Sequence, residues 1–96
     1  MVSNNLILKY RDNIFDVAKE YGLRNIRVFG SMAQNTAKPD SDIDLLVEID
    51  ADRSLLDVIQ AKQKIEDITH RKVDIVTEKS LSPYIRQEVL DSAVVL

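Results

Sequence analysis

The segment GSMAQNTAKPDSDIDLLV, residues 30–47, decides the fold that we expect for this chain of 96 residues. An apolar run that ends at Phe29 precedes it, so a strand is expected to lead directly into the tight turn Gly30-Ser31. Backbone N–H groups collect where a turn opens a helix, so Gly30 lets the backbone approach an anion and the Ser31 hydroxyl donates to it. The segment therefore predicts a strand, a turn that could hold a triphosphate, and a short helix over 31–36.

The second half of the segment places two carboxylates on one strand. Polar and apolar residues alternate over 41–47, so Asp42 and Asp44 are expected on the same face. Residues two apart on a strand are separated by about 6.5–7 Å, and their side chains can converge on metal ions about 3.5–4 Å from one another. Mg²⁺ is held by carboxylates together with substrate phosphate oxygens, which predicts a site that ATP completes. Asp74, in the alternating run 72–77, is the candidate third acid.

The surroundings of the aspartate pair favour a bound cation over a structural accident. Acids on an exposed strand face are common, so an Asp-x-Asp pair by itself is weak evidence. Here Leu45, Leu46 and Val47 follow directly, and two like charges on a largely apolar strand cost stability unless a cation neutralises them. Asp74 has an open alternative, because a single acid in a strand is also common in a purely structural role.

These residues resemble the DNA polymerase β superfamily of nucleotidyltransferases. Its members carry Gly-Ser after the first strand, Asp-x-Asp on the next strand and a third Asp on a later one, which matches Gly30-Ser31, Asp42-Ile43-Asp44 and Asp74. The chain is most similar to the minimal nucleotidyltransferases, small bacterial and archaeal proteins often paired with a HEPN-type toxin as its antitoxin. The resemblance covers nearly the whole chain and implies an α/β (α+β) fold with a small mixed sheet flanked by helices.

The resemblance also implies a reaction, a partner and a role for each site residue. AMP would pass from Mg-ATP to a hydroxyl, with a tyrosine of a partner HEPN-type toxin as the acceptor. Asp42 and Asp44 would hold two Mg²⁺ ions, and Asp74 would ligate the catalytic ion and help to deprotonate the acceptor. Gly30 and Ser31 would hold the triphosphate. Because the chain has no further domain to bind an acceptor, the partner is expected to present it.

One departure from the family pattern leaves two alternatives open. In these relatives the turn continues as Gly-Ser-x-Ala-Arg-Gly, whereas Gln34 and Asn35 follow Ala33 in this chain. The change removes a cation and a flexible glycine, although Asn tolerates the left-handed backbone better than most residues. The first alternative is an antitoxin with a weak or inactive site that neutralises the toxin by direct binding. The second is a self-contained enzyme that modifies a small molecule.

Composition restricts the class of protein. The chain is 45% hydrophobic and 30% charged, as expected for one soluble domain over 1–96, and no apolar run approaches the about 20 residues of a membrane helix. Without a signal peptide it is expected to be cytoplasmic. There is no cysteine and one histidine, so disulfides and a zinc site are not expected. A net charge of −3, with no basic stripe, disfavours tight nucleic-acid binding.

The remaining segments alternate helix and strand. Apolar spacing predicts a helix over 5–21 stopped by Gly22, and a strand over 25–29 with Arg27 directed to solvent. It also predicts a helix that is capped by Ser54 and ends near an exposed His70. The apolar stripe of this helix is formed by Leu55, Val58, Ala61, Ile65 and Ile68. This helix is long enough to cross between parallel strands. Ser82-Pro83 predicts the start of a last helix. The apolar tail 93–96 either packs on its own sheet or offers an edge to a partner.

Overall fold

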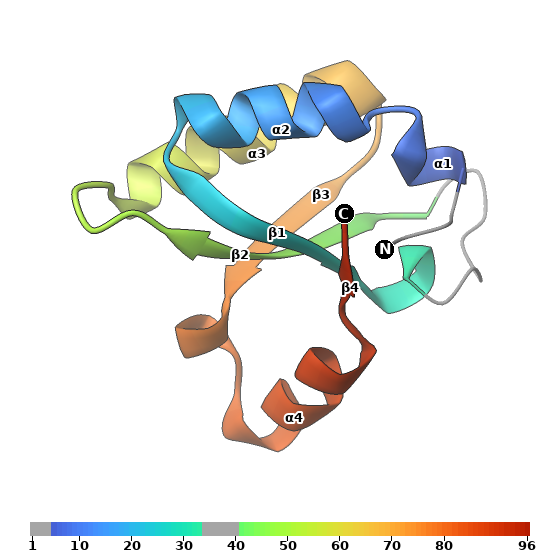
Figure 1. Ribbon diagram of the computed structural model, residues 1–96, viewed down its shortest axis with the longest axis vertical. Helices are drawn as coiled ribbons and strands as arrows, with labels where there is room; N and C mark the ends of the chain where they lie inside the picture. Colours follow the sequence, from blue (N-terminus) through green and yellow to red (C-terminus); the bar gives the residue numbers. More distant parts are fainter. Residues whose placement is uncertain (1–4, 34–40) are drawn as a thin grey trace.

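The computed structural model describes residues 5–33 and 41–96, which form one mixed β-sheet with helices on both faces (Figure 1). The sheet order is β3-β2-β1-β4, with β2 and β3 parallel and β1 antiparallel to both of its neighbours. This confirms the predicted mixed sheet flanked by helices. In chain order the elements are α1 (Asn5–Leu8), α2 (Arg11–Glu20), β1 (Leu23–Phe29), the 3₁₀ turn η1 (Gly30–Met32), β2 (Ile43–Ile49), α3 (Leu55–Thr69), β3 (Val73–Thr77), the 3₁₀ turn η2 (Glu78–Ser80), α4 (Pro83–Ser92) and β4 (Val94–Val95).

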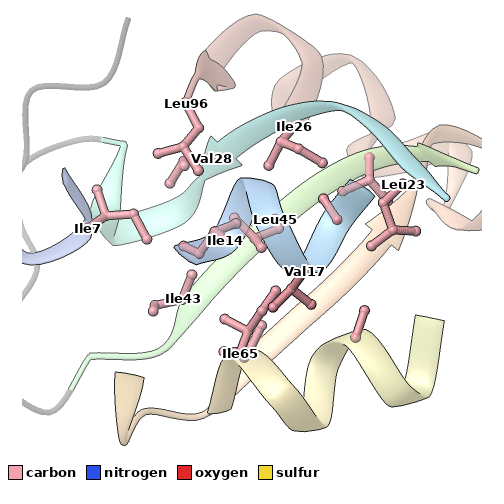
Figure 2. Close-up of a cluster of buried hydrophobic side chains, with 14 of the residues drawn as sticks. Ile7, Ile14, Val17, Leu23, Ile26, Val28, Ile43, Leu45, Ile65 and Leu96 are labelled. Atoms are coloured by element: carbon pink, nitrogen blue, oxygen red, sulfur yellow. The ribbon is translucent and has the colours of Figure 1, made fainter. Parts of the chain in front are cut away.

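Helices α2 and α3 cover one face of the sheet, and the hydrophobic core lies between them and the strands (Figures 1 and 2). The core strands alternate as expected: Ile43, Leu45 and Val47 of β2 are at most 1% exposed and point toward the helices. The buried cluster also contains Ile7, Ile14, Val17, Ala18, Leu23, Ile26, Val28, Met32, Val58, Ala61, Ile65, Val73 and Leu96. The other face of the sheet carries only α4 and η2 (Figure 1) among the elements of the described residues.

The predicted crossover helix is confirmed, with one correction. Ser54 and Asp57 form a capping box at its start, and His70 ends it in the left-handed conformation with φ 55°. The buried stripe runs through Val58, Ala61, Ile65 and Thr69. Leu55 was expected on this stripe but is 72% exposed, because the first turn of α3 lies at the outer end of the helix, beyond the core (Figure 1).

The predicted helix over 5–21 is two helices rather than one. The chain turns at Lys9 and Tyr10, where the Tyr10 N–H donates to Ile7 O at 3.0 Å and closes α1. The break lets Ile7 and Ile14 both reach the core, at 0% and 1% exposure, although α1 lies past the end of the sheet that α2 covers (Figure 1).

The apolar tail packs on its own sheet, which resolves the alternative left open by the sequence. β4 pairs antiparallel with β1, and the Leu96 N–H donates to Ile26 O at 3.1 Å. The Leu96 side chain is completely buried, and Arg11 Nε donates to Leu96 O at 2.6 Å. Within residues 5–33 and 41–96, no helix has the length and apolar character needed to span a membrane.

Candidate active site

Gly30 stands at the junction between β1 and the η1 turn, and two features require glycine there. Its φ is +70°, a conformation that residues with a side chain rarely adopt. In addition, a Cβ atom at this position would collide with Asp44 Oδ2. The backbone of the turn therefore lies directly against the Asp44 carboxylate, and the predicted approach of this backbone to a bound anion stays a prediction. Ser31 follows within η1 and is half-buried.

Asp44 and Asp74 are side by side on the face of the sheet opposite the helices. They are partners in the parallel ladder between β2 and β3, which is anchored where the Ile43 N–H donates to Lys72 O at 2.9 Å. Paired residues on neighbouring strands are about 5 Å apart and share a face. Because Ile43 and Leu45 point into the core, Asp44 points to the open side, as the alternation predicted. Asp74 is exposed there.

Asp42 lies just before this strand rather than within it. β2 begins at Ile43, one residue later than the acidic pair required, and Asp42 is exposed in the lead-in. It nevertheless affects the same site. The pKa of Asp44 is raised above its ordinary value of 3.8, first by burial and then by the negative charges of Asp74 and Asp42. Three carboxylates therefore act on one another around Asp44, and the ionised state of Asp44 is costly.

The donor chemistry fits Mg²⁺, but the acids do not enclose an ion by themselves. Carboxylate oxygens are the ligands this ion prefers, and a cation would relieve the mutual repulsion that raises the pKa of Asp44. Within the part of the chain that the structure describes, no three acidic, histidine or cysteine side chains are close enough to hold one metal ion. A site of this kind needs further oxygens, which the phosphates of a nucleotide can supply.

The family departure at Gln34 and Asn35 lies outside the described residues, as does most of the short helix predicted over 31–36. Two hollows in the surface, of about 450 and 410 Å³, lie elsewhere, and the three aspartates do not line either of them. The smaller hollow is bounded by the last residues of β2, by η2 and by Arg86 of α4.

Sequence reasoning was wrong about Arg27. Its side chain was expected in solvent but is only 14% exposed, and its Nη1 donates to Glu78 Oε1 at 3.1 Å. Its Nη2 is buried without a hydrogen-bond partner among the described residues. Arg27 points to the same face as Asp44, where η2 folds back and covers it. Local alternation could not have found this, because Glu78 is 51 residues away in the chain.

Comparisons with known proteins identify several relatives of this chain. A family model described as "Nucleotidyltransferase domain" matches residues 12–96. The protein adenylyltransferase MntA of Thermococcus cleftensis is 37% identical over 79 residues, which is 82% of this chain and 80% of that protein. A candidate protein adenylyltransferase of Methanocaldococcus jannaschii, MJ0435, is 34% identical over 88 residues, covering 92% of this chain and 95% of that protein.

Solved structures show the same fold. A candidate minimal nucleotidyltransferase superposes with a TM-score of 0.82 at 38% identity, covering 94% of this chain and 92% of that one. A toxin–antitoxin complex with the ATP analogue AMP-PNP gives a TM-score of 0.72 at 26% identity, covering 85% of this chain and 68% of the matched one. The similarity therefore extends over almost the whole chain and reaches proteins that form such complexes.

Proposed function

Because the chain belongs to the nucleotidyltransferase domain family and is a minimal nucleotidyltransferase homologous to protein adenylyltransferases, we propose that it transfers AMP from Mg-ATP to a hydroxyl of a partner protein. The observation that carries the proposal is the position of Asp44. Its carboxylate lies against the Gly30 turn, beside Asp74, and its pKa is raised by burial and by its acidic neighbours. A bound cation would stabilise the ionised form of such a carboxylate, and the same cation can also bind an anionic substrate.

Each site residue has a specific role in this proposal. Gly30 and Ser31 hold the triphosphate through the backbone and the hydroxyl. Asp42 and Asp44 hold two Mg²⁺ ions, and Asp74 ligates the catalytic ion and accepts the proton of the acceptor hydroxyl. Magnesium, when bound, neutralises charge on the attacking and leaving oxygens. The hydroxyl oxygen bonds to the α-phosphorus, the bond from this phosphorus to the bridging oxygen breaks, and pyrophosphate leaves.

The proposed acceptor is a tyrosine of a HEPN-type toxin, with this chain as the antitoxin. Support comes from relatives: MntA is a protein adenylyltransferase, and a matched structure is a toxin–antitoxin complex with AMP-PNP. A phenol has an unperturbed pKa of about 10, so it requires help from a base and a cation at neutral pH. An added AMP brings bulk and negative charge, which would block the toxin if the tyrosine lies near its active site.

A second candidate function is neutralisation by contact, with a weak or inactive site. One observation favours it: no three of the potential ligand side chains in the described residues converge on a single point. The two functions separate when Asp42 and Asp44 are both replaced by Asn. The enzyme then loses neutralisation while the complex stays intact, whereas a contact inhibitor keeps both.

The direct test is intact mass spectrometry of the protein encoded by the neighbouring gene, after incubation with this chain, ATP and Mg²⁺. A mass increase of one or more AMP groups that disappears with the Asp42→Asn, Asp44→Asn variant supports the transferase. A stable complex without added mass, together with unchanged neutralisation, supports the contact inhibitor. Binding of AMP-PNP in the presence of Mg²⁺ provides a separate measurement of the nucleotide site.

A further inference from the structure

The chain itself contains one highly accessible phenol. It has three tyrosines, and Tyr84 is 96% exposed. Tyr10 and Tyr21 are half-buried against the hydrophobic core, and the ammonium groups of Lys9 and Lys64 lie over their rings at 5.4 and 5.3 Å. Of the three, Tyr84 is the one whose side chain does not pack against the core.

Helix α4 holds Tyr84 in a defined position. The helix is ten residues long, with Ser82 as its N-cap and Pro83 at its start, and Ser82 Oγ accepts from the Tyr84 N–H at 3.3 Å. The backbone of Tyr84 is therefore fixed while its side chain remains in solvent. No residue of α4 is buried, so the helix stands out from the sheet (Figure 1).

Nearby aliphatic hydroxyls are less suitable acceptors. Ser80 Oγ donates to Thr77 O at 2.8 Å, and Ser92 Oγ donates to Val89 O at 3.3 Å. Ser82 Oγ is used in the cap of α4. Phenols as a class ionise more readily than aliphatic alcohols. The phenol of Tyr84 makes no hydrogen bond to any other described residue. Its oxygen also lies farther from the backbone, which suits insertion into a cleft.

The side chain points away from the site on its own molecule. Arg86 is two residues farther along α4 and faces the sheet, since its Nη2 lies 3.8 Å from Glu78 Oε2, and Glu78 in turn bonds to Arg27 of β1. Two residues in an α-helix are about 200° apart around the axis. Tyr84 therefore projects from the side of α4 opposite the sheet that carries Asp44.

We propose that Tyr84 of one molecule is an acceptor for the Asp44 site of a second copy of this chain, so that the enzyme adenylylates itself between molecules. The inference rests on the proposed function. The phenol oxygen of Tyr84 forms a bond with the α-phosphorus of ATP, and the bond to the bridging oxygen breaks. Pyrophosphate leaves, and the phenolic proton passes to the carboxylate of Asp74 in the second copy.

The test uses two distinguishable copies of the full chain. The donor copy keeps its acids and carries Tyr84→Phe. The acceptor copy carries Asp42→Asn and Asp44→Asn, keeps Tyr84 and has a tag that changes its mass. After incubation with ATP and Mg²⁺, intact mass spectrometry should show one AMP on the acceptor copy alone, and peptide mapping should place it on Tyr84. The initial rate should rise in proportion to the concentration of each copy.

Tyrosine-to-phenylalanine variants of the acceptor copy show which residue accepts the AMP. An acceptor copy with Tyr84→Phe should lose the label completely, whereas one with Tyr21→Phe should keep it. Label on another residue, or no label on the acceptor copy, overturns the inference. If the neighbouring-gene protein is still modified under the same conditions, the proposed transferase function stands without self-modification. If neither protein is modified and AMP-PNP does not bind, the transferase proposal fails as well.

Discussion

The two faces of the sheet differ in what they contribute, although the same strands form both. On the helix-covered face, Ile43, Leu45 and Val47 of β2 are almost completely buried. On the opposite face, Asp44 of the same strand meets Asp74 of β3, and the pKa of Asp44 is raised. Alternation along one strand thus separates residues that stabilise the fold from residues whose charges cost stability.

The open face is not polar along its whole length. Leu46, two residues beyond Asp44 on the same side of β2, is completely buried and is paired in register with Arg27 and Val76. Arg27 is held there by Glu78 of η2. Asp44 and Asp74 therefore lie at one end of this face, where β1 gives way to the Gly30 turn. The two ends of this face therefore differ, because the acids lie at one end and η2 covers Arg27 farther along the strands.

The two faces should differ most in how much folding stability is lost when a side chain is truncated to alanine. The largest loss is expected for a core residue. We expect Leu45→Ala to reduce the free energy of unfolding by about 2–5 kcal/mol, because the side chain is 1% exposed and the cavity cannot refill completely. Its matched control is Ile85→Ala on α4, which is 47% exposed and should cost less than about 1 kcal/mol. Urea unfolding of both variants measures the difference. Equal losses would contradict the division into a stabilising face and a functional one.

Two glycine variants separate stability from function. Gly30→Ala and Gly22→Ala both force a side chain into a positive φ, of +70° and +74°, and each should cost about 1–2 kcal/mol of folding free energy. The added Cβ at position 30 meets Asp44 Oδ2, whereas at position 22 it meets the flexible side chain of Arg53. AMP-PNP binding, measured by calorimetry, should be lost in the first variant and kept in the second. Retention of binding in both would show that the Gly30 turn does not hold the nucleotide.

The ion pair between Arg27 and Glu78 of η2 should contribute less to folding stability than the two glycines do. Glu78→Gln weakens the hold on Arg27, whose side chain is 14% exposed, so we expect a loss of about 1 kcal/mol. The loss should shrink as salt is added, since Glu78 itself is 39% exposed and screening reaches it. Glu88→Gln, an exposed acid on α4, serves as the control for the change in net charge. A loss that is independent of salt would assign the effect to packing rather than to the charge pair.

The fold was predictable because it depends on local patterns. The alternation over β2 and the capping box of Ser54 and Asp57 each use residues close together in the chain. The crossover from β2 to β3 then fixes a parallel pair. The break in the first helix was not predictable, because its apolar spacing continues through Tyr10. Packing of both Ile7 and Ile14 into one core imposes the turn instead.

The positions of the candidate site residues were predictable only in part. The sequence identified Asp44 and Asp74, and the parallel register brings them together as expected. It placed Asp42 within the strand, whereas β2 begins one residue later. It also left Arg27 in solvent. The burial of Arg27 depends on the contact with Glu78, and contacts between residues far apart in the chain leave no local periodic signal.

The smallest expected change in stability is a gain rather than a loss, and it comes from replacing Asp44. Its pKa is raised in the folded state above 3.8, so the folded chain binds more protons than the unfolded chain between the two pKa values, and stability falls as pH rises through that interval. Asp44→Asn removes this cost. We expect the variant to be more stable at pH 7 by about 0.5 kcal/mol, discounted for solvent exposure, or about 2–4 °C in melting temperature.

The same variant connects the stability cost to the ligand. The gain should vanish below the unfolded pKa, where Asp44 is protonated in both states and no charge remains to remove. Mg²⁺ should raise the melting temperature of the original chain more than that of Asp44→Asn, because binding relieves a repulsion that the variant no longer has. Asp52→Asn, an exposed acid in the connection before α3, controls for net charge. If Asp44→Asn proved less stable at pH 7, burial of this carboxylate would be compensated within the protein, and the argument for a cation at Asp44 would lose its electrostatic basis.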